Sequence, residues 1–222
     1  MKMGIIGLPN SGKTTIFNAL TKMEATVSTY SDAKAEPNVA IVSVDDDRLH
    51  SLSDMYKPKK TTGATIEMID FPGLKEGSAK NGLFTGSAMG WIKGIDALAL
   101  VVRNFYNDIN GDATPLRDID EIATELMLAD LILLENRLEK IAWFQKRGQK
   151  TNALALEEKT LQRIAEYLNN NEPIRTIGLD EDEETIIRGF QFLTKKPILL
   201  VLNSDEAVFG RNENLITEIE SR

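Results

Sequence analysis

The sequence predicts an α/β fold with a mostly parallel, doubly wound sheet and an inserted pair of long helices. Three observations indicate this fold. Short apolar segments typical of buried strands alternate with amphipathic stretches. A glycine-rich turn joins the first of these strands to a helix. Beyond residue 115, apolar residues instead recur at threes and fours, which is the period of a helix.

Composition limits the class of protein. The chain has 222 residues, 42% of them apolar, which is enough to bury a core. Cysteine is absent, so disulfides and thiolate metal sites are excluded, and the apolar runs are too short to span a bilayer. A net charge of −8 argues against broad electrostatic binding of nucleic acid, but not against a local basic patch. We expect a cytoplasmic protein with neither a membrane nor DNA as partner.

The first strand, expected over 3–6, leads into a loop with the spacing of a phosphate-binding loop. Residues 7–14 read Gly-Leu-Pro-Asn-Ser-Gly-Lys-Thr, which is G-x-x-x-x-G-K-T. The glycines let backbone N–H groups surround a β-phosphate, Lys13 reaches the β- and γ-oxygens, and the Thr14 hydroxyl can bind Mg²⁺. A helix predicted over 14–20 points its positive end at the same anion. We predict Lys13 as catalytic, Thr14 as a metal ligand, and these as nucleotide-binding residues: Asn10, Ser11, Gly12, Lys13, Thr14 and Thr15.

The segment after the first helix is a candidate switch loop. Residues 24–35 are polar and irregular and end in Glu36-Pro37-Asn38, where a mobile loop would close over a γ-phosphate. A strand is expected over 39–44. Three aspartates at 45–47 then precede a helix, and we interpret them as helix caps rather than metal ligands. The only histidine, His50, is expected to have a surface or packing role.

The next strand, expected over 64–69, ends in Asp70-Phe71-Pro72-Gly73. This is D-x-x-G at a strand end, downstream of a phosphate loop. In that position Asp70 can hold a water of Mg²⁺ and the amide of Gly73 can sense the γ-phosphate. We therefore predict Asp70 as a metal residue and Gly73 as a catalytic one.

Two apolar segments predict further parallel strands. Residues 97–102 are nearly all apolar and indicate a central strand covered on both faces. A helix over 82–93 should precede it, with Trp91 and Ile92 on the buried side. Residues 198–202 predict another buried strand, which ends in Asn203-Ser204-Asp205-Glu206 at the edge where a doubly wound sheet binds its ligand. We predict Asn203, Ser204 and Glu206 as nucleotide-binding residues.

Two long amphipathic helices should separate these last two strands. The first spans about thirty residues from Pro115, and the second follows Gly148, so together they form an antiparallel hairpin. We interpret the hairpin as a coiled-coil arm at 113–189, inserted into a nucleotide-binding domain at 1–112 and 190–222. The expected buried positions are Ile119, Ile122, Leu126, Leu133, Leu134, Leu138 and Ile141 in the first helix, and Ala153, Leu156, Leu161, Ile164 and Leu168 in the second.

The predicted tip of this arm is basic. Between positions 137 and 150, five basic residues face one glutamate, a local charge of +4, and Trp143 and Phe144 lie among them. Such a tip could contact RNA backbone. A solvated helix end, with its aromatic rings packed in the hairpin, explains the pattern equally well. The basic residues are Arg137, Lys140, Lys146, Arg147 and Lys150.

Shorter helices are expected at the end of the chain. Asp180 and Glu183 have the spacing of a capping box for a helix over about 181–190. This accounts for the acidic cluster at 180–184 without a metal. A final helix is expected over about 214–221.

In this order the motifs resemble the Obg-like ATPase family, the YchF type of translation-factor-related P-loop NTPases. The shared features are the phosphate loop, Glu-Pro-Asn at 36–38, D-x-x-G-Leu at 70–74, the helical insertion and N-x-x-E at 203–206. The resemblance covers essentially the whole chain. It implies a Ras-like G domain that hydrolyses ATP or GTP as a Mg²⁺-dependent switch and associates with ribosomes. Asn10 matches an asparagine that helps hold K⁺ in some relatives, which makes K⁺ a second candidate ion.

The base-binding motif bears on the choice of nucleotide. GTP-specific relatives have N-K-x-D, in which the aspartate accepts from guanine N1–H and N2–H₂ and the lysine stem covers the ring. Here Ser204 occupies the lysine position and Glu206 the aspartate position. We hypothesise ATP in preference to GTP, although Asp205 could serve guanine if the loop shifted.

Several departures from the family concern hydrolysis. Lys34 replaces a threonine that would bind Mg²⁺, the loop after Arg103 lacks a histidine, and the glycine-rich stretch after D-x-x-G is eroded at 79–83. Nucleotide binding is thus better supported than turnover, and a nucleotide-gated ribosome or RNA adaptor with little or no hydrolysis is the alternative function. A sixth Ras-like strand and the family's C-terminal TGS domain do not fit after Glu206, as expected of either a truncated chain or a natural short form.

Overall fold

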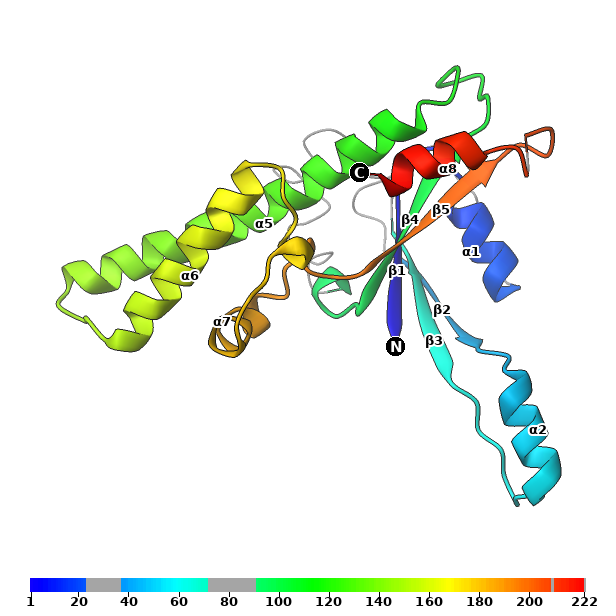
Figure 1. The fold of residues 1–222 in the computed structure, drawn as a ribbon, viewed down its shortest axis with the longest axis horizontal. Helices are drawn as coiled ribbons and strands as arrows, with labels where there is room; N and C mark the ends of the chain where they lie inside the picture. Colours follow the sequence, from blue (N-terminus) through cyan, green and yellow to red (C-terminus); the bar gives the residue numbers. More distant parts are fainter. Residues whose placement is uncertain (23–36, 72–90, 209, 222) are drawn as a thin grey trace.

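The computed structural model describes residues 1–22, 37–71, 91–208 and 210–221. Its described strands form one sheet in the order β2-β3-β1-β4-β5 (Figure 1). Strands β1, β3, β4 and β5 run parallel, whereas β2 pairs antiparallel with β3. The predicted α/β fold with a mostly parallel sheet is therefore confirmed. The bounds are β1 Lys2–Ile6, β2 Asn38–Ser43, β3 Thr65–Asp70, β4 Ala97–Asn104 and β5 Ile198–Ser204.

Strand β4 is covered on both faces, as its unbroken apolar sequence predicts. Ala97, Ala99 and Val101 belong to the core on one face, with Phe17 of helix α1 (Lys13–Thr21). The alternate residues, Leu98 among them, belong to the core on the other face, with Ile122 of helix α5 (Pro115–Lys146). Successive side chains of a strand point to opposite faces, so a strand between two helical layers needs an apolar residue at every position.

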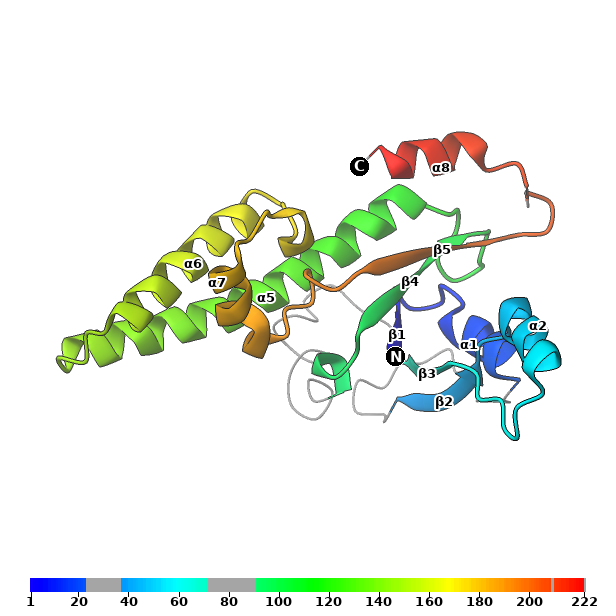
Figure 2. The same cartoon turned by 60° about the horizontal axis from the view of Figure 1, so that its bottom comes forward.

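The long helices form the predicted hairpin. Helix α5 leaves the sheet, and α6 (Asn152–Asn169) returns beside it, as both ribbon views show (Figures 1 and 2). Gly148 lies in the turn with φ 85°, a conformation that glycine adopts without the steric penalty of a side chain. The short elements η1 (Ile174–Thr176), α7 (Glu181–Ile187) and η2 (Arg188–Phe190) follow, and they lead the chain back to the sheet.

The first turn of α6 differs from the expected buried face. Ala153 and Leu156 are exposed, whereas Leu154 packs on the arm core with Leu161 and Leu168. Positions 154, 161 and 168 are spaced by seven, so they remain on one side of a helix that packs against another. The side-chain oxygen of Thr151 accepts from the N–H of Leu154 and starts the helix in this phase.

Asp130 of α5 joins the arm to the segment that enters β5. Its carboxylate accepts from the N–H groups of Leu193 and Thr194, each at 2.8 Å, and from the Thr194 hydroxyl at 2.7 Å. The residue is only 2% exposed, and this burial raises the pKa of Asp130 to about 6, although its hydrogen bonds oppose the shift. These bonds connect residues more than 60 positions apart.

Two further expectations about burial are wrong. Strand β5 is an edge strand among the described strands, and the side chain of Leu199 is 55% exposed. Trp91 is also exposed, although its neighbour Ile92 is buried as expected. Leu199 lies in an apolar run and Trp91 is a large apolar residue beside Ile92. Such a pattern predicts burial but does not identify the elements that cover a given face.

Helix α2 (Asp47–Tyr56) and helix α8 (Glu213–Glu220) complete the described elements. The N-cap of α2 is Asp46, whose carboxylate accepts from the N–H of Arg48, and His50 contacts Asp45 on the surface. Asp180 and Glu183 form the predicted capping box of α7. None of the helices in the described part of the chain is both long enough and apolar enough to cross a membrane.

Candidate phosphate-loop site

The phosphate loop is packed against β4 and the end of β5. A Cβ atom added to Gly7 would lie 2.4 Å from the carbonyl oxygen of Val101 in β4. One added to Gly12, where φ is 90°, would lie 2.2 Å from the amide nitrogen of Asn203 in β5. Both distances are far below van der Waals contact. At Gly7 the Cβ would clash with a backbone oxygen, whereas at Gly12 it would displace the Asn203 amide and the left-handed backbone would be strained. The predicted glycine spacing therefore reflects close packing of the loop.

Lys13 is buried at the start of α1. Its ammonium group donates to the carbonyl oxygen of Leu8 at 2.9 Å, within the loop itself. Burial lowers the pKa of Lys13 from 10.5 to about 8, and the nearby charge of Asp70 partly opposes this shift. An anion bound in the loop would favour the charged ammonium, so the residue suits a phosphate group.

Thr14 and Asp70 meet beside this lysine. The Thr14 hydroxyl donates to Oδ2 of Asp70 at 2.8 Å, and the Asn38 amide donates to the same oxygen at 3.4 Å. Burial raises the pKa of Asp70, and its hydrogen bonds from Thr14 and Asn38 and the charge of Lys13 oppose this change. Oδ1 of Asp70 and the hydroxyl of Ser11 are buried and have no hydrogen-bond partner among the described residues.

This arrangement fits Mg²⁺. A hydroxyl and a carboxylate supply the oxygen ligands that this ion prefers, and the unpartnered Oδ1 leaves one carboxylate oxygen for the ion or its water. The described residues contain no cluster of three or more acidic or histidine side chains that could hold a metal. Mg²⁺ would therefore be held by Thr14 and Asp70 together with the bound phosphates.

At the edge predicted to bind the base, one of the three predicted residues contacts the loop. The side-chain amide of Asn203 donates to the carbonyl oxygen of Ser11 at 3.0 Å. Ser204 instead accepts from the amides of Asn104 and Asn212, at 3.0 Å and 3.1 Å. Glu206 is exposed in the turn after β5. Thr15 is exposed at the start of α1, beside the buried Lys13 and the partly buried Thr14.

Some predicted residues lie outside the described part of the chain. These are the proposed catalytic Gly73, Leu74, the segment 79–83, and Lys34 and Glu36 of the candidate switch loop. Pro37 and Asn38 are the described residues of the Glu-Pro-Asn motif, and the side-chain amide of Asn38 connects the motif to Asp70.

The structure adds three polar residues that sequence reasoning missed. Asn38 lies opposite Asp70 in the β2–β3 ladder, and Asn104 lies opposite Ser204 in the β4–β5 ladder. Asn212 precedes α8 and donates to the same serine. Strand register decides these contacts, and the sequence alone does not give the register of strands that are far apart in the chain.

Arg103 shapes the loop that follows β4. Its buried guanidinium donates to the carbonyl oxygens of Phe105, Gly111 and Asp112, all within 2.8 Å. The bridge between Asn107 and Gly111 closes the same loop. The arginine is therefore a structural residue of the loop.

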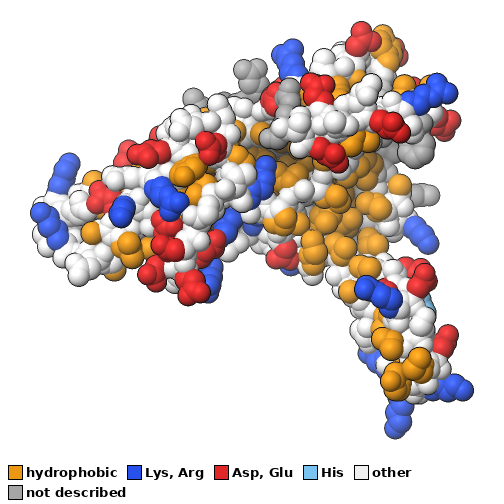
Figure 3. Space-filling view, viewed as in Figure 1, with side chains coloured by type: hydrophobic (Ala, Val, Ile, Leu, Met, Phe, Trp, Pro, Cys, Tyr) orange, Lys and Arg blue, Asp and Glu red, His pale blue; other side chains and the backbone are white. Residues whose placement is uncertain are grey.

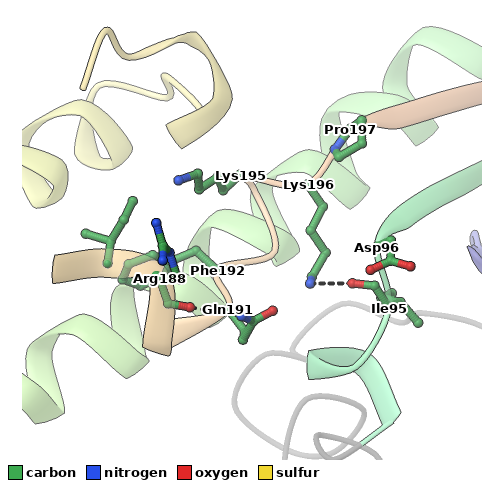
Figure 4. Close-up of a pocket in the computed structure, with 9 residues that line it drawn as sticks. Ile95, Asp96, Arg188, Gln191, Phe192, Lys195, Lys196 and Pro197 are labelled. Carbon is green, nitrogen blue, oxygen red and sulfur yellow. Dashed lines mark hydrogen bonds between the residues drawn. The ribbon is translucent and has the colours of Figure 1, made fainter. Parts of the chain in front are cut away.

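A cavity of about 290 Å³ lies at the opposite edge of the sheet, where the chain enters β4 and β5 (Figure 4). Two of the cations that line it already have partners within the fold. Lys196 donates to the carbonyl oxygen of Ile95 at 2.6 Å, as Figure 4 shows, and Lys195 forms an ion pair with Glu184. These interactions make the cavity a feature of the junction between the arm and the sheet, separate from the phosphate site.

Comparisons with known proteins identify the family of the chain. Residues 2–137 match the family described as 50S ribosome-binding GTPase. The chain is 38% identical over 218 residues to the ribosome-binding ATPase YchF of Pasteurella multocida, covering 96% of this chain and 60% of that protein. It is 35% identical over 207 residues to the protein of the same name in Bacillus subtilis, covering 91% of this chain and 56% of that protein.

A solved structure is similar over nearly the whole chain. The YchF GTPase of Schizosaccharomyces pombe superposes with a TM-score of 0.74 and 29% identity, covering 98% of this chain and 61% of that chain. The chain thus spans about 60% of the length of the first of these curated relatives.

Proposed function

The chain belongs to the 50S ribosome-binding GTPase family as a YchF-type, Obg-like member, and on this premise we propose that it binds ATP or GTP with Mg²⁺ and hydrolyses it as a conformational switch. Nucleotide binding is assigned to residues 1–112 and 190–222, and partner contact to the insertion at 113–189. The ribosome is the proposed partner, because the relatives are named ribosome-binding ATPases. A ribosome-associated protein would be cytoplasmic.

The observation that carries the proposal is the arrangement of Lys13, Thr14 and Asp70. A buried ammonium faces the loop, and a hydroxyl bonded to a buried carboxylate lies next to it. Burial lowers the pKa of Lys13, and its ammonium group forms no ion pair with a described residue. A bound phosphate would therefore compensate the charge of Lys13 better than any group now beside it. This combination supports phosphate binding more directly than the motif spacing does.

In this proposal the chain's own residues position the phosphates and balance their charge. Lys13 lies against the β- and γ-phosphates, and the backbone N–H groups of the loop surround the β-phosphate. Thr14 and Asp70 would hold Mg²⁺, and the bound ion would supply positive charge that offsets the charge of the phosphate oxygens. Gly73 is proposed to sense the γ-phosphate. Asn10 is the residue through which K⁺ would act.

ATP is the proposed nucleotide in preference to GTP. In an N-K-x-D site the lysine stem covers the base, whereas here Ser204 is held by Asn104 and Asn212 and is too short to do so. Glu206 is exposed and free to move toward a base, but its longer side chain does not match the paired N–H groups of guanine as an aspartate would. Asn203 would support the base indirectly, by fixing the phosphate loop.

The arm tip is proposed as the contact with ribosomal RNA. Arg137 forms an ion pair with Glu157 at 2.7 Å, and this contact joins the two helices of the arm. The exposed cations of the tip are Lys140, Lys146, Arg147 and Lys150. Trp143 is 48% exposed, and the guanidinium of Arg147 lies 3.8 Å from its ring centroid. An exposed aromatic ring beside exposed cations suits RNA, which offers both phosphates and stacking bases.

The test measures nucleotide binding and phosphate release separately. We expect the purified chain to bind ATP more tightly than GTP and to release phosphate in Mg²⁺, with K⁺ and Na⁺ compared at equal ionic strength, with and without ribosomes. Lys13→Ala should abolish binding, and retained affinity would contradict the assignment of the site. If the chain binds nucleotide but releases no phosphate in all of these conditions, the alternative function, a nucleotide-gated ribosome or RNA adaptor, is indicated instead.

A further inference from the structure

We propose that the end of α2 is a second RNA-binding surface, which contacts the RNA of the large ribosomal subunit independently of the arm. We call this surface the α2 tip and define it as residues 55–60, Met-Tyr-Lys-Pro-Lys-Lys. The choice of RNA as its ligand rests on the proposed function. The surface itself is outside both the phosphate site and the arm.

Helix α2 projects from the sheet and contributes no buried residue. Tyr56 is 74% exposed and Met55 is 71% exposed, and Leu52 one turn earlier is also exposed. Figures 1 and 2 show the helix extending away from the sheet beyond β2, on the side of the molecule opposite the arm. Isolated exposed apolar residues are common on protein surfaces. Here three of them lie together on one projecting helix, and none of them is buried against the rest of the described fold.

Three lysines gather at the end of α2 and in the loop that follows it. At the helix start, Asp46 pairs with Arg48 and Asp45 contacts His50. At the other end, Lys57, Lys59 and Lys60 are exposed, and none of them forms an ion pair with a described residue. The three lysines and Asp54 leave a local charge of +2 over residues 54–60. Figure 3 shows the resulting arrangement, with basic side chains beside hydrophobic ones at the far end of α2.

The backbone of the tip is held in place before any ligand binds. Lys57 adopts the left-handed conformation that ends the helix, and its N–H donates to the carbonyl oxygen of Ser53 at 2.8 Å. The hydroxyls of Ser53 and Thr61 are 2.6 Å apart and close the loop, and Pro58 restricts its backbone. Because these bonds use no lysine side chain, all three ammonium groups are presented from an ordered turn, which reduces the entropy lost on binding.

The tip has the same chemistry as the proposed RNA contact on the arm. Each has an exposed aromatic ring, Tyr56 here and Trp143 there, beside several exposed cations. Phosphates can satisfy lysines from many directions, and a base can stack on the ring, so neither contact requires a specific sequence. A protein ligand would have to supply carboxylates at matching positions. The acidic remainder of the chain, with its net charge of −8, would confine RNA binding to such local patches.

Binding should be measured with two probes, intact large ribosomal subunits and the deproteinised RNA of the same subunit. The variant Lys59→Glu/Lys60→Glu should weaken binding to both probes by at least about tenfold near 0.1 M salt. It should also reduce the slope of log Kd against log salt by roughly 1.4, because two phosphate contacts are lost. Tyr56→Ala should weaken binding about fivefold or more through loss of stacking and leave the slope unchanged.

Matched controls separate the tip from general electrostatics. Arg188→Glu/Arg211→Glu makes the same charge change at two other exposed positions, and Tyr106→Ala removes another exposed tyrosine. Both should bind like the wild type. Equal melting temperatures for all variants would confirm that each is folded, as expected because α2 contributes no buried residue.

The other outcomes are also decisive. Unchanged binding by the tip variants, or equal weakening by the controls, would overturn the inference and leave the proposed function standing. If the tip variants bind the intact subunit more weakly but bind the free RNA like the wild type, the ligand of the α2 tip is a ribosomal protein. This result would also overturn the inference. If the wild-type chain binds neither probe, the ribosome partner of the proposed function fails, and this inference fails with it.

Discussion

The side-chain amide of Asn203 donates a hydrogen bond of 3.0 Å to the carbonyl oxygen of Ser11, which ties the end of β5 to the phosphate loop. The segment that enters the same strand is held by Asp130 of α5. A single strand therefore connects the base of the arm with the loop proposed to bind nucleotide. This connection gives the loop and the arm a common structural element.

The contact between Asn203 and the loop predicts the effect of a methyl group at Gly12. Gly12→Ala should reduce nucleotide affinity at least about tenfold, because its Cβ would lie 2.2 Å from the Asn203 amide. Gly148→Ala is the matched control, since Gly148 has a similar φ of 85° and no neighbour within 4 Å of such a Cβ. Nucleotide titration of both variants measures the difference. Asn203→Ala removes the atom that the new Cβ would meet, so the loss of affinity in the double variant should be smaller than the sum of the losses in the two single variants. Losses that simply add would contradict the steric explanation.

The lowered pKa of Lys13 predicts a pH dependence of nucleotide binding. Burial lowers this pKa to about 8, so the free protein loses the lysine proton as the pH rises above 8. A bound phosphate requires the charged form and raises the pKa again, so binding takes up a proton. The dissociation constant should therefore rise about tenfold per pH unit above pH 8 and change little between pH 6 and 7.5. Calorimetry in buffers of different ionisation enthalpy should detect proton uptake near pH 9, and its absence would contradict the prediction.

Asp70 should make nucleotide affinity dependent on Mg²⁺. Asp70→Asn keeps the size of the side chain but removes its charge, so the gain in nucleotide affinity on adding Mg²⁺ should fall at least tenfold. Affinity in EDTA should change much less, because Lys13 and the loop remain. Asp182→Asn, at an exposed acid on α7, is the control and should behave like the wild type. An Asp70→Asn protein that retains the full Mg²⁺ effect would exclude Asp70 from the metal site.

The residues after β5 should control the choice of base. Ser204→Lys with Glu206→Asp restores N-K-x-D, so the ratio of GTP to ATP affinity should increase at least about tenfold relative to the wild type. Glu206→Asp alone should give a smaller change, because Ser204 remains bonded to Asn104 and Asn212. Competition titrations with both nucleotides measure the ratio. An unchanged ratio in the double variant would show that these two positions do not select the base.

Asp130 should contribute to stability in two opposing ways. Asp130→Ala leaves the N–H groups of Leu193 and Thr194 without their acceptor, so the free energy of unfolding should fall by about 2–4 kcal/mol at neutral pH. In the wild type the folded-state pKa of Asp130, about 6, is above the unfolded value near 3.8. The folded state therefore binds the proton more tightly, and this carboxyl reduces stability as the pH rises from about 4 to 6.

Denaturant titrations between pH 4 and 7 would check both statements about Asp130. Between about pH 4 and 6, ionisation of Asp130 should lower the free energy of unfolding of the wild type, and the Asp130→Ala variant should lack this decrease. Asp182→Ala, at an exposed position, should change the free energy of unfolding by less than about 0.5 kcal/mol. A variant of Asp130 as stable as this control would contradict the role of the carboxylate as an anchor.

Much of the architecture could be predicted from local sequence. The glycine spacing around Lys13 identified the turn between β1 and α1, and the unbroken apolar run at 97–102 identified a strand buried on both faces. The period of three and four identified the helices of the arm, and Asp180 with Glu183 identified the start of α7. These features depend on residues close together in the chain, so their spacing is sufficient to predict them.

Other features were decided by packing between distant segments. Leu199 looked like a core residue, but β5 lies at the edge of the described sheet, and Leu154 replaced Ala153 and Leu156 on the buried face of α6. The contact of Asn38 with Asp70 depends on strand register, as does that of Asn104 with Ser204. A shift of one residue in either strand would turn these side chains to the other face.

By itself, the sequence determined that this protein has a phosphate loop, an α/β sheet and a helical arm, because each depends on short-range spacing. Only the tertiary structure decided that Asn203 secures the loop, that Ser204 is held by two asparagines, and that Asp130 anchors the arm to the segment that enters β5. Each of these contacts joins residues from different elements. Register and helix phase place them together, and neither is encoded in a local pattern.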